Sequence, residues 1–178
     1  MIKFFALTAF RSKIKWRFNL ALITVASFIF MAGAVQAADL VRPTPSIAAA
    51  EVVAIQLTGL KHNNVGGEDL GIRQTWAFAH PQNRAITGPF PRFAMMMKGP
   101  AYAKLLDHKS HDIKPVQKAA TGRHENGEMW QKFDVLMETD VGDILHFFWV
   151  VQKVAAGQFK DCWMTVGVSA PRPAGVSG

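Results

Sequence analysis

The stretch "EMWQKFDVLMETDVGDILHFFWVVQ", residues 128–152, decides the fold class. In its first half, up to Asp140, mainly apolar side chains alternate with charged ones, which is typical of a strand with one buried face. Its second half, from Ile144, is apolar nearly throughout, as in a strand buried on both faces. The residues "TDVGD" (139–143) between the halves predict a three-residue hairpin loop with Gly142 at positive φ. We therefore expect two antiparallel strands joined by a tight loop.

The length of this loop sets the register of the hairpin. With Thr139 paired to Asp143, three apolar pairs face the core: Phe133 with Trp149, Val135 with Phe147, and Met137 with Leu145. His146 then pairs with Leu136 on the opposite face, near Asp134. A two-residue turn would shift the pairing by one residue and turn His146 toward the core. We favour the first register because it matches apolar residues with apolar residues.

Upstream of the hairpin the apolar period is helical. Three helices are predicted there: one after the N-cap Ser46 that ends before "KHNNVGG" (61–67), one over 68–79 that Pro81 ends, and one from about Thr87 to Met97. The stretch "AYAKLLD" adds one or two more helical turns. Pro89 suits the first helical position of the third helix.

Two further strands flank the hairpin: "DIKPVQKAA" (112–120) is a candidate edge strand, and "DCWMTVGVSA" (161–170) is the last strand. Helices first and antiparallel strands after indicate an α+β domain. We expect three N-terminal helices packed on a curved antiparallel sheet of about four strands.

Residues 1–37 predict a secretory signal peptide. A basic leader without acidic residues precedes an apolar run of 16 residues, 20–35, and Val35 and Ala37 suit a signal peptidase at positions −3 and −1. An uncleaved anchor is the alternative, but the run is shorter than the roughly 20 residues of a spanning helix. After cleavage we expect a linker over 38–46, one domain over 47–170 and a disordered tail over 171–178. The protein is then periplasmic or secreted, with no stable membrane span.

Cleavage would also change the charge. The chain carries +7, but five of its 20 basic residues lie in the leader, and the remaining 15 against 13 acidic residues give +2. The high isoelectric point is therefore no evidence for a nucleic-acid partner. The single Cys162 cannot form an internal disulfide, so the domain must rely on packing.

The stretch "GIRQTWAFAHPQNRAITGPFPRFAMMM" (71–97), with "PAYAKLL" (100–106), resembles a bacterial and plant family described only as a domain of unknown function. The matching positions are Gly71, Ile72, Phe78, Ala79, Pro81, Asn83, Thr87, Gly88, Pro89, Arg92, Phe93, Pro100 and Tyr102. His80 departs from the pattern, which usually has Ser there. The resemblance implies a cone-shaped, cystatin-like α+β fold similar to nuclear transport factor 2, with three helices on a bent sheet. It implies no catalytic residue, because the family has no established activity.

Two ligand sites are candidates. A cavity inside the cone could hold a small apolar ligand, lined by Trp76, Phe93, Met97, Tyr102, Phe133 and Trp149. The alternative is that these side chains simply fill the core. An anion could bind at the helix start near Thr87, gripped by Arg84 and Arg92. Pro89 and Pro91 weaken that site, because they have no N–H to donate.

The chemistry of the candidate residues favours a non-catalytic protein. Asp134 and His146 are the candidates for an acid or base, but the favoured register places both away from the core. In "DHKSHD" (107–112), His108 and His111 could chelate a metal, but a solvated polar loop is the favoured interpretation. We expect no metal centre and no cofactor. The sequence predicts an exported small-molecule-binding or protein-interaction module; the alternative is an enzyme of lyase or isomerase type.

The second face of the sheet is also predicted to be apolar, through Leu136, Ile144, Phe148, Val150, Met164, Val166 and Val168. Such a face is too apolar to be left in water. Either the chain's own termini cover it, or two copies pair through their sheets as a homodimer.

Overall fold

The computed structural model describes residues 39–116, 121–123 and 128–174. Helices come first and antiparallel strands follow, which confirms the α+β class. The four helices are α1 (Ala49–Lys61), α2 (Leu70–Ala77), α3 (Pro81–Thr87) and α4 (Phe90–Met97), and a short 3₁₀ turn, η1 (Ala103–Leu105), follows them. None of the helices in these described ranges is long and apolar enough to cross a membrane. The predicted signal peptide lies outside the described residues.

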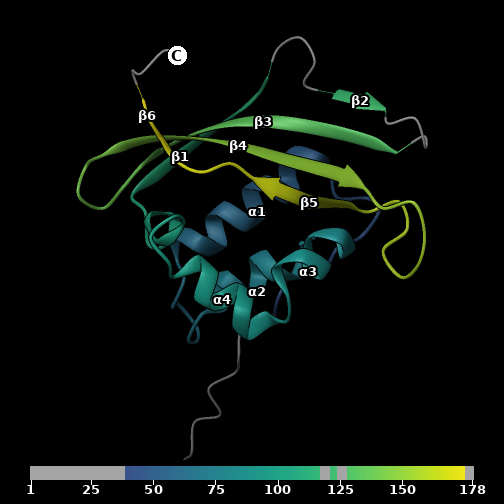
Figure 1. The fold of residues 1–178 in the computed structure, drawn as a ribbon, viewed down its shortest axis with the longest axis horizontal. Coiled ribbons are helices and arrows are strands. Elements are labelled where there is room, and N and C mark those ends of the chain that lie inside the picture. Colours follow the sequence, from purple (N-terminus) through teal and green to yellow (C-terminus); the bar gives the residue numbers. More distant parts are fainter. Residues whose placement is uncertain (1–38, 117–120, 124–127, 175–178) are drawn as a thin grey trace, which may run out of the picture. The chain divides into compact units, whose positions relative to one another are not determined.

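The strands are β1 (Ser110–Pro115), β2 (Thr121–Arg123), β3 (Met129–Glu138), β4 (Ile144–Lys153), β5 (Trp163–Val168) and β6 (Arg172–Pro173). The main order is β1-β3-β4-β5; β2 also pairs with β3, and β6 with β4. All four helices lie on the same side of this sheet (Figure 1). The edge strand predicted over 112–120 is β1, and residues 117–120 lie outside the described residues.

The predicted register of the β3–β4 hairpin is confirmed. Phe133 pairs with Trp149, and His146 with Leu136, while the N–H of Thr139 donates to the carbonyl of Asp143 at 2.9 Å. Gly142 has φ of 90°, the left-handed conformation that its place in the loop requires. The ladder runs through nine consecutive pairs without a bulge, which keeps the two long strands from bending sharply. The sheet is accordingly not strongly curled, unlike the curved sheet predicted (Figure 1).

The predicted corner after Pro81 contains a helix of its own, α3, so the described residues form four helices rather than the three predicted. His80 caps α3: its Nδ1 accepts a hydrogen bond from the N–H of Gln82 at 3.2 Å. Pro81 occupies the first helical position, where its missing N–H costs nothing. The oxygen of a serine, the residue usual at this position in the family pattern, could accept the same hydrogen bond. His80 therefore departs from the pattern in residue type but still caps the helix.

The last strand predicted over 161–170 is β5, but a β-bulge makes the predicted face of Val168 wrong. Val150 pairs with Gly167 and Val151 with Thr165, so Val166 is an extra residue without a partner in the ladder. An extra residue reverses the alternation beyond it. Val168 therefore packs against the core, instead of sharing the outer face with Val166.

The helices bury an apolar face against the sheet. α1 contributes Val52, Val53, Leu57 and Leu60, all fully buried. α1 and α2 approach most closely at two glycines: a Cβ on Gly71 would lie 2.1 Å from the carbonyl oxygen of Gly59. Only glycine allows this contact, which sets how deeply α2 packs behind α1.

Residues of the predicted linker (38–46) and of the predicted tail (171–178) contact the rest of the domain. The backbone of Val41 forms two hydrogen bonds, each 2.9 Å long, with the side-chain amide of Gln74 in α2. In the predicted disordered tail, Arg172 and Pro173 form β6 against β4.

Candidate functional site

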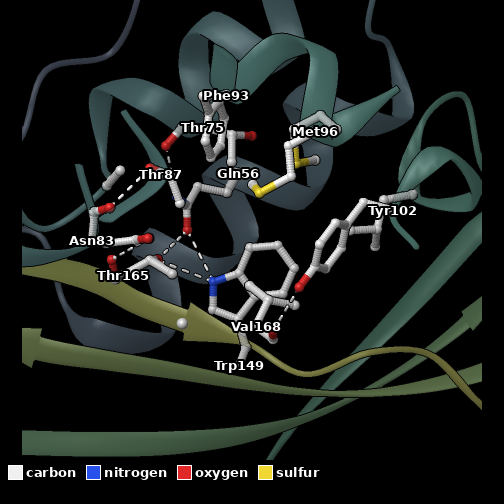
Figure 2. A pocket seen from close by; sticks show the side chains of 14 residues that line it. Gln56, Thr75, Asn83, Thr87, Phe93, Met96, Tyr102, Trp149, Thr165 and Val168 are labelled. Carbon is white, nitrogen blue, oxygen red and sulfur yellow. Dashed lines mark hydrogen bonds between the residues drawn. The ribbon is translucent and has the colours of Figure 1, made fainter. Parts of the chain in front are cut away.

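A pocket of about 140 Å³ lies between the helices and the sheet (Figure 2). Phe93 and Met96 of α4 close it from the helix side, and Trp149 of β4 forms its floor on the sheet side. Its apolar wall is completed by Ala79, Met97, Tyr102, Leu105 and Val168. Val168 reaches this wall because of the bulge at Val166. The pocket therefore depends on an irregularity of β5.

A buried polar cluster forms one side of the pocket. Gln56, fully buried on α1, accepts hydrogen bonds from Trp149 Nε1 at 3.1 Å and from Thr165 Oγ1 at 2.5 Å. Its Nε2 donates to the carbonyl of Thr75 at 3.0 Å. A buried amide must be hydrogen-bonded to be tolerated, and these contacts also hold the indole ring in one orientation.

Two residues of α3 extend this polar side. Asn83 Nδ2 donates to the carbonyl of Thr165 at 3.2 Å, and Thr87 Oγ1 donates to the carbonyl of Asn83 at 2.8 Å. Asn83 Oδ1 accepts no hydrogen bond from any residue in the described ranges. It is therefore an acceptor that a ligand with an O–H or N–H could use without displacing a protein contact.

Among the described residues, the pocket lining has no carboxylate, histidine, lysine or arginine. A neutral ligand loses no charge solvation on entering such a site, whereas an ion would lose its hydration without a counter-charge. General acid–base catalysis needs a titratable side chain within reach of the reacting proton. The phenol of Tyr102 donates its O–H to the carbonyl of Val168 at 3.3 Å.

Four of the six predicted apolar ligand-binding residues line the pocket: Phe93, Met97, Tyr102 and Trp149. Phe133 is buried in the core but does not line it. Trp76 lies behind the wall, with its ring 5.0 Å from that of Phe93, and lines a different recess. The polar residues Gln56, Asn83, Thr87 and Thr165 were missed. For Gln56 a signal existed, since it lies between Val53 and Leu60 on the apolar face of α1.

Of the two arginines predicted to grip an anion near Thr87, Arg92 lies at the helix start beside Gly88, but Arg84 does not. Arg84 turns away from the helix start: its Nε donates to the carbonyl of Ala79, and its Nη2 donates to those of Trp76 and Ala77, at 2.8–2.9 Å. Burial lowers its pKa. Arg84 thus holds the C-terminal end of α2. Arg92 is exposed on α4 and lines neither the pocket nor the recess that contains Arg84.

Asp134 and His146 lie on the sheet face opposite the helices, as the favoured register predicted. The Nε2 of His146 contacts the Oδ1 of Asp134, and its ring packs edge-on against Phe148 at 4.9 Å. Lys132 Nζ lies 3.7 Å from the centre of the Phe148 ring. Neither Asp134 nor His146 lines the pocket. Their contact lies on the outer face of the sheet.

The sequence suggested that His108 lies in a solvated loop, but its side chain is buried, with 2% of its surface exposed. Its Nδ1 donates to the carbonyl of Leu105 at 2.8 Å, and its Nε2 lies 2.8 Å from His111 Nδ1. Nε2 of His108 is then the acceptor and His111 Nδ1–H the donor. Burial lowers the pKa of His108 to about 4 and lowers that of His111 as well. In the described part of the chain, no group of three histidine, cysteine or acidic side chains could hold a metal ion.

Comparison with protein-family models, with curated proteins and with solved structures finds no match for this chain. Membership of the domain-of-unknown-function family therefore stays a prediction from the motif residues. The structure supports its coarser content, N-terminal helices packed on an antiparallel sheet. What the protein binds must be inferred from the chemistry of its pocket.

Proposed function

We propose that this protein is an exported, non-catalytic binding protein for a small neutral molecule with an apolar body and one hydrogen-bond donor. The pocket over Trp149 carries the proposal, because its apolar wall faces a fixed polar cluster and none of its described lining residues is charged. Its volume of about 140 Å³ suits a ligand of one ring. Apolar cavities of about 150 Å³ are known to take up benzene.

The ligand's ring lies among Phe93, Met96 and Trp149, and its donor is directed to Asn83 Oδ1. The polar cluster of Gln56 and Thr165 is already hydrogen-bonded, so it positions the indole floor rather than the ligand. A lyase or isomerase, the alternative function, needs an acid or base beside its substrate. Asp134 and His146 lie on the other face of the sheet, so their placement favours binding without catalysis.

The resemblance supports the finer classification: helices covering one face of an antiparallel sheet suit the nuclear-transport-factor-2-like type. The leader over residues 1–37 supports a periplasmic or secreted location. Both belong to the proposal, as does the absence of a nucleic-acid partner, which the charge of the mature chain supports.

Calorimetric titration with phenol and indole tests the proposed pocket. We expect saturable binding to the wild-type protein and its loss in Val168→Phe, which fills the pocket. Val166→Phe is the matched control, because Val166 lies two residues earlier on β5 and does not line the pocket. Equal binding by the two variants, or no binding by the wild type, would contradict the proposal.

A further inference from the structure

A second recess, of about 660 Å³, lies on the far side of α2 from the α1 contact at Gly71. It is lined by the segment 39–43, by residues of α2, α3 and α4, and by the loop before β5. We call it the arginine recess, after its three arginines and three aromatic rings: Arg42, Arg73, Arg84, Trp76, Phe90 and Phe159. In the described part of the chain it shares no lining residue with the pocket over Trp149.

Two of the arginines, Arg73 and Arg84, pack against the aromatic rings of the recess. The guanidinium carbon of Arg73 lies 4.6 Å from the centre of the Phe90 ring. That of Arg84 lies 5.1 Å from the Trp76 ring and 5.3 Å from the Phe159 ring. A guanidinium whose face is against a ring keeps its N–H groups free at its edge, where they can meet a carboxylate in a bidentate geometry.

The recess has an excess of positive charge. Among the described residues, its lining contains three arginines and one carboxylate, Asp39. Across the described ranges, none of the three arginines forms an ion pair with a carboxylate. Arg84 is neutralised in part by the carbonyls at the end of α2, which accept its hydrogen bonds. Among the described residues, Arg42 and Arg73 have no such partners, which leaves their donors to a ligand within this part of the chain.

We propose that the arginine recess binds an organic anion: a carboxylate, held by Arg73 and Arg42, on an aromatic body that packs against Trp76 and Phe159. The volume lies within the range of about 300–1,000 Å³ that small-molecule sites occupy. Bidentate contacts of arginine with carboxylate give this site its selectivity for the anion. This inference does not depend on the function proposed for the other pocket, which takes a neutral ligand.

Calorimetric titration at low salt with phenylpropionate and its neutral counterpart phenylpropionamide tests the inference. The wild-type protein should bind the acid about tenfold more tightly than the amide, the difference a charge-assisted hydrogen bond supplies. Arg73→Gln should remove that preference, and Arg42→Gln should reduce it. Arg92→Gln is the matched control: it removes an exposed arginine outside the recess and should change nothing. Circular dichroism confirms that each variant is folded.

Two results would overturn the inference. One is equal affinity of the wild type for the acid and the amide. The other is a preference for the acid that survives both Arg73→Gln and Arg42→Gln. The Val168→Phe variant separates the two sites, since filling the pocket over Trp149 should leave phenylpropionate binding in the arginine recess unchanged. Loss of phenylpropionate binding in Val168→Phe would place the ligand in the other pocket and also refute the inference.

Discussion

The side-chain oxygen of Gln56 accepts a hydrogen bond from the indole N–H of Trp149 at 3.1 Å, although the two residues are 93 positions apart in the chain. This bond joins the first helix to the central strand at the floor of the pocket. Both side chains are fully buried. Their contact is therefore a polar link between the helical layer and the sheet.

Gln56→Leu should lower the free energy of unfolding by about 1–3 kcal/mol. The buried hydroxyl of Thr165 loses its acceptor and the carbonyl of Thr75 loses a donor, while Trp149 Nε1 keeps only Thr165 Oγ1. Urea denaturation measures the change, and near-ultraviolet circular dichroism reports whether the indole loses its fixed orientation. Thr58→Val, at an exposed position of α1, is the control. A Gln56→Leu protein as stable as the wild type would show that the cluster contributes nothing.

Gly71→Ala should destabilise the fold by about 3 kcal/mol, at the upper end of the usual overpacking cost. The added Cβ would lie 2.1 Å from a carbonyl oxygen of α1, a backbone atom that cannot move aside as a side chain can. Gly167→Ala is the matched control, since its Cβ would meet nothing within 4 Å. Chemical denaturation of the two variants should give clearly different midpoints, and similar midpoints would contradict the packing argument.

Acidification should destabilise the protein through His108. Its pKa falls from 6.5 to about 4 on folding, so the folded state keeps it neutral while the unfolded state takes up a proton. The contribution of neutral His108 to the free energy of unfolding is complete above pH 6.5 and is lost as the pH falls toward 4. The total loss is on the order of 3 kcal/mol. His80 and His111, whose pKa values burial also lowers, add to the effect with the same sign.

Denaturation curves measured between pH 7 and pH 4.5 test this dependence. His108→Gln should flatten it, because glutamine does not titrate. His62→Gln, at an exposed position, is the control and should change the dependence only slightly, because His62 is the smallest of the influences that lower the pKa of His108. An unchanged slope in His108→Gln would mean that other groups cause the loss of stability.

The cap of α3 can be tested with two variants of nearly equal size. His80→Ser retains a side-chain acceptor for the N–H of Gln82, whereas His80→Ala removes it. Both leave the same space behind, so their difference isolates the cap. We expect the serine variant to be more stable by about 1 kcal/mol in thermal or urea denaturation. Equal stability would show that the bond to Nδ1 is not what starts the helix.

The homodimer predicted through the sheet stays a prediction. The structure reduces the number of apolar residues that could form its interface. Val168 faces the core and Met164 is buried, while Leu136 and Ile144 are each 42% exposed on the outer face. If two copies pair there, light scattering at tens of micromolar should show a dimer, and Leu136→Glu should dissociate it. Val141→Glu, at the exposed hairpin tip, is the control. A monomeric wild-type protein at that concentration would count decisively against the dimer.

The hairpin shows how much of the fold was readable in advance. Its register was predicted because the loop residues from Thr139 to Gly142 and the apolar alternation on each side act over short distances. α3 was missed because Pro81 both ends one helix and begins the next, and the sequence showed only the first of these signals. The site was half predicted: its aromatic wall followed from periodicity, but its polar side did not.

By itself, the sequence determined the α+β class, the pairing of β3 with β4 and the placement of Asp134 and His146 away from the core. These follow from local rules, since strand alternation and turn chemistry depend on neighbours in the chain. Only the tertiary structure decided that Val168 turns inward, that Arg84 holds the end of α2 and that Gln56 meets Trp149. Each of these depends on which segments the packed core brings together, and a single unpaired residue, Val166, is enough to reverse the face on which a side chain lies.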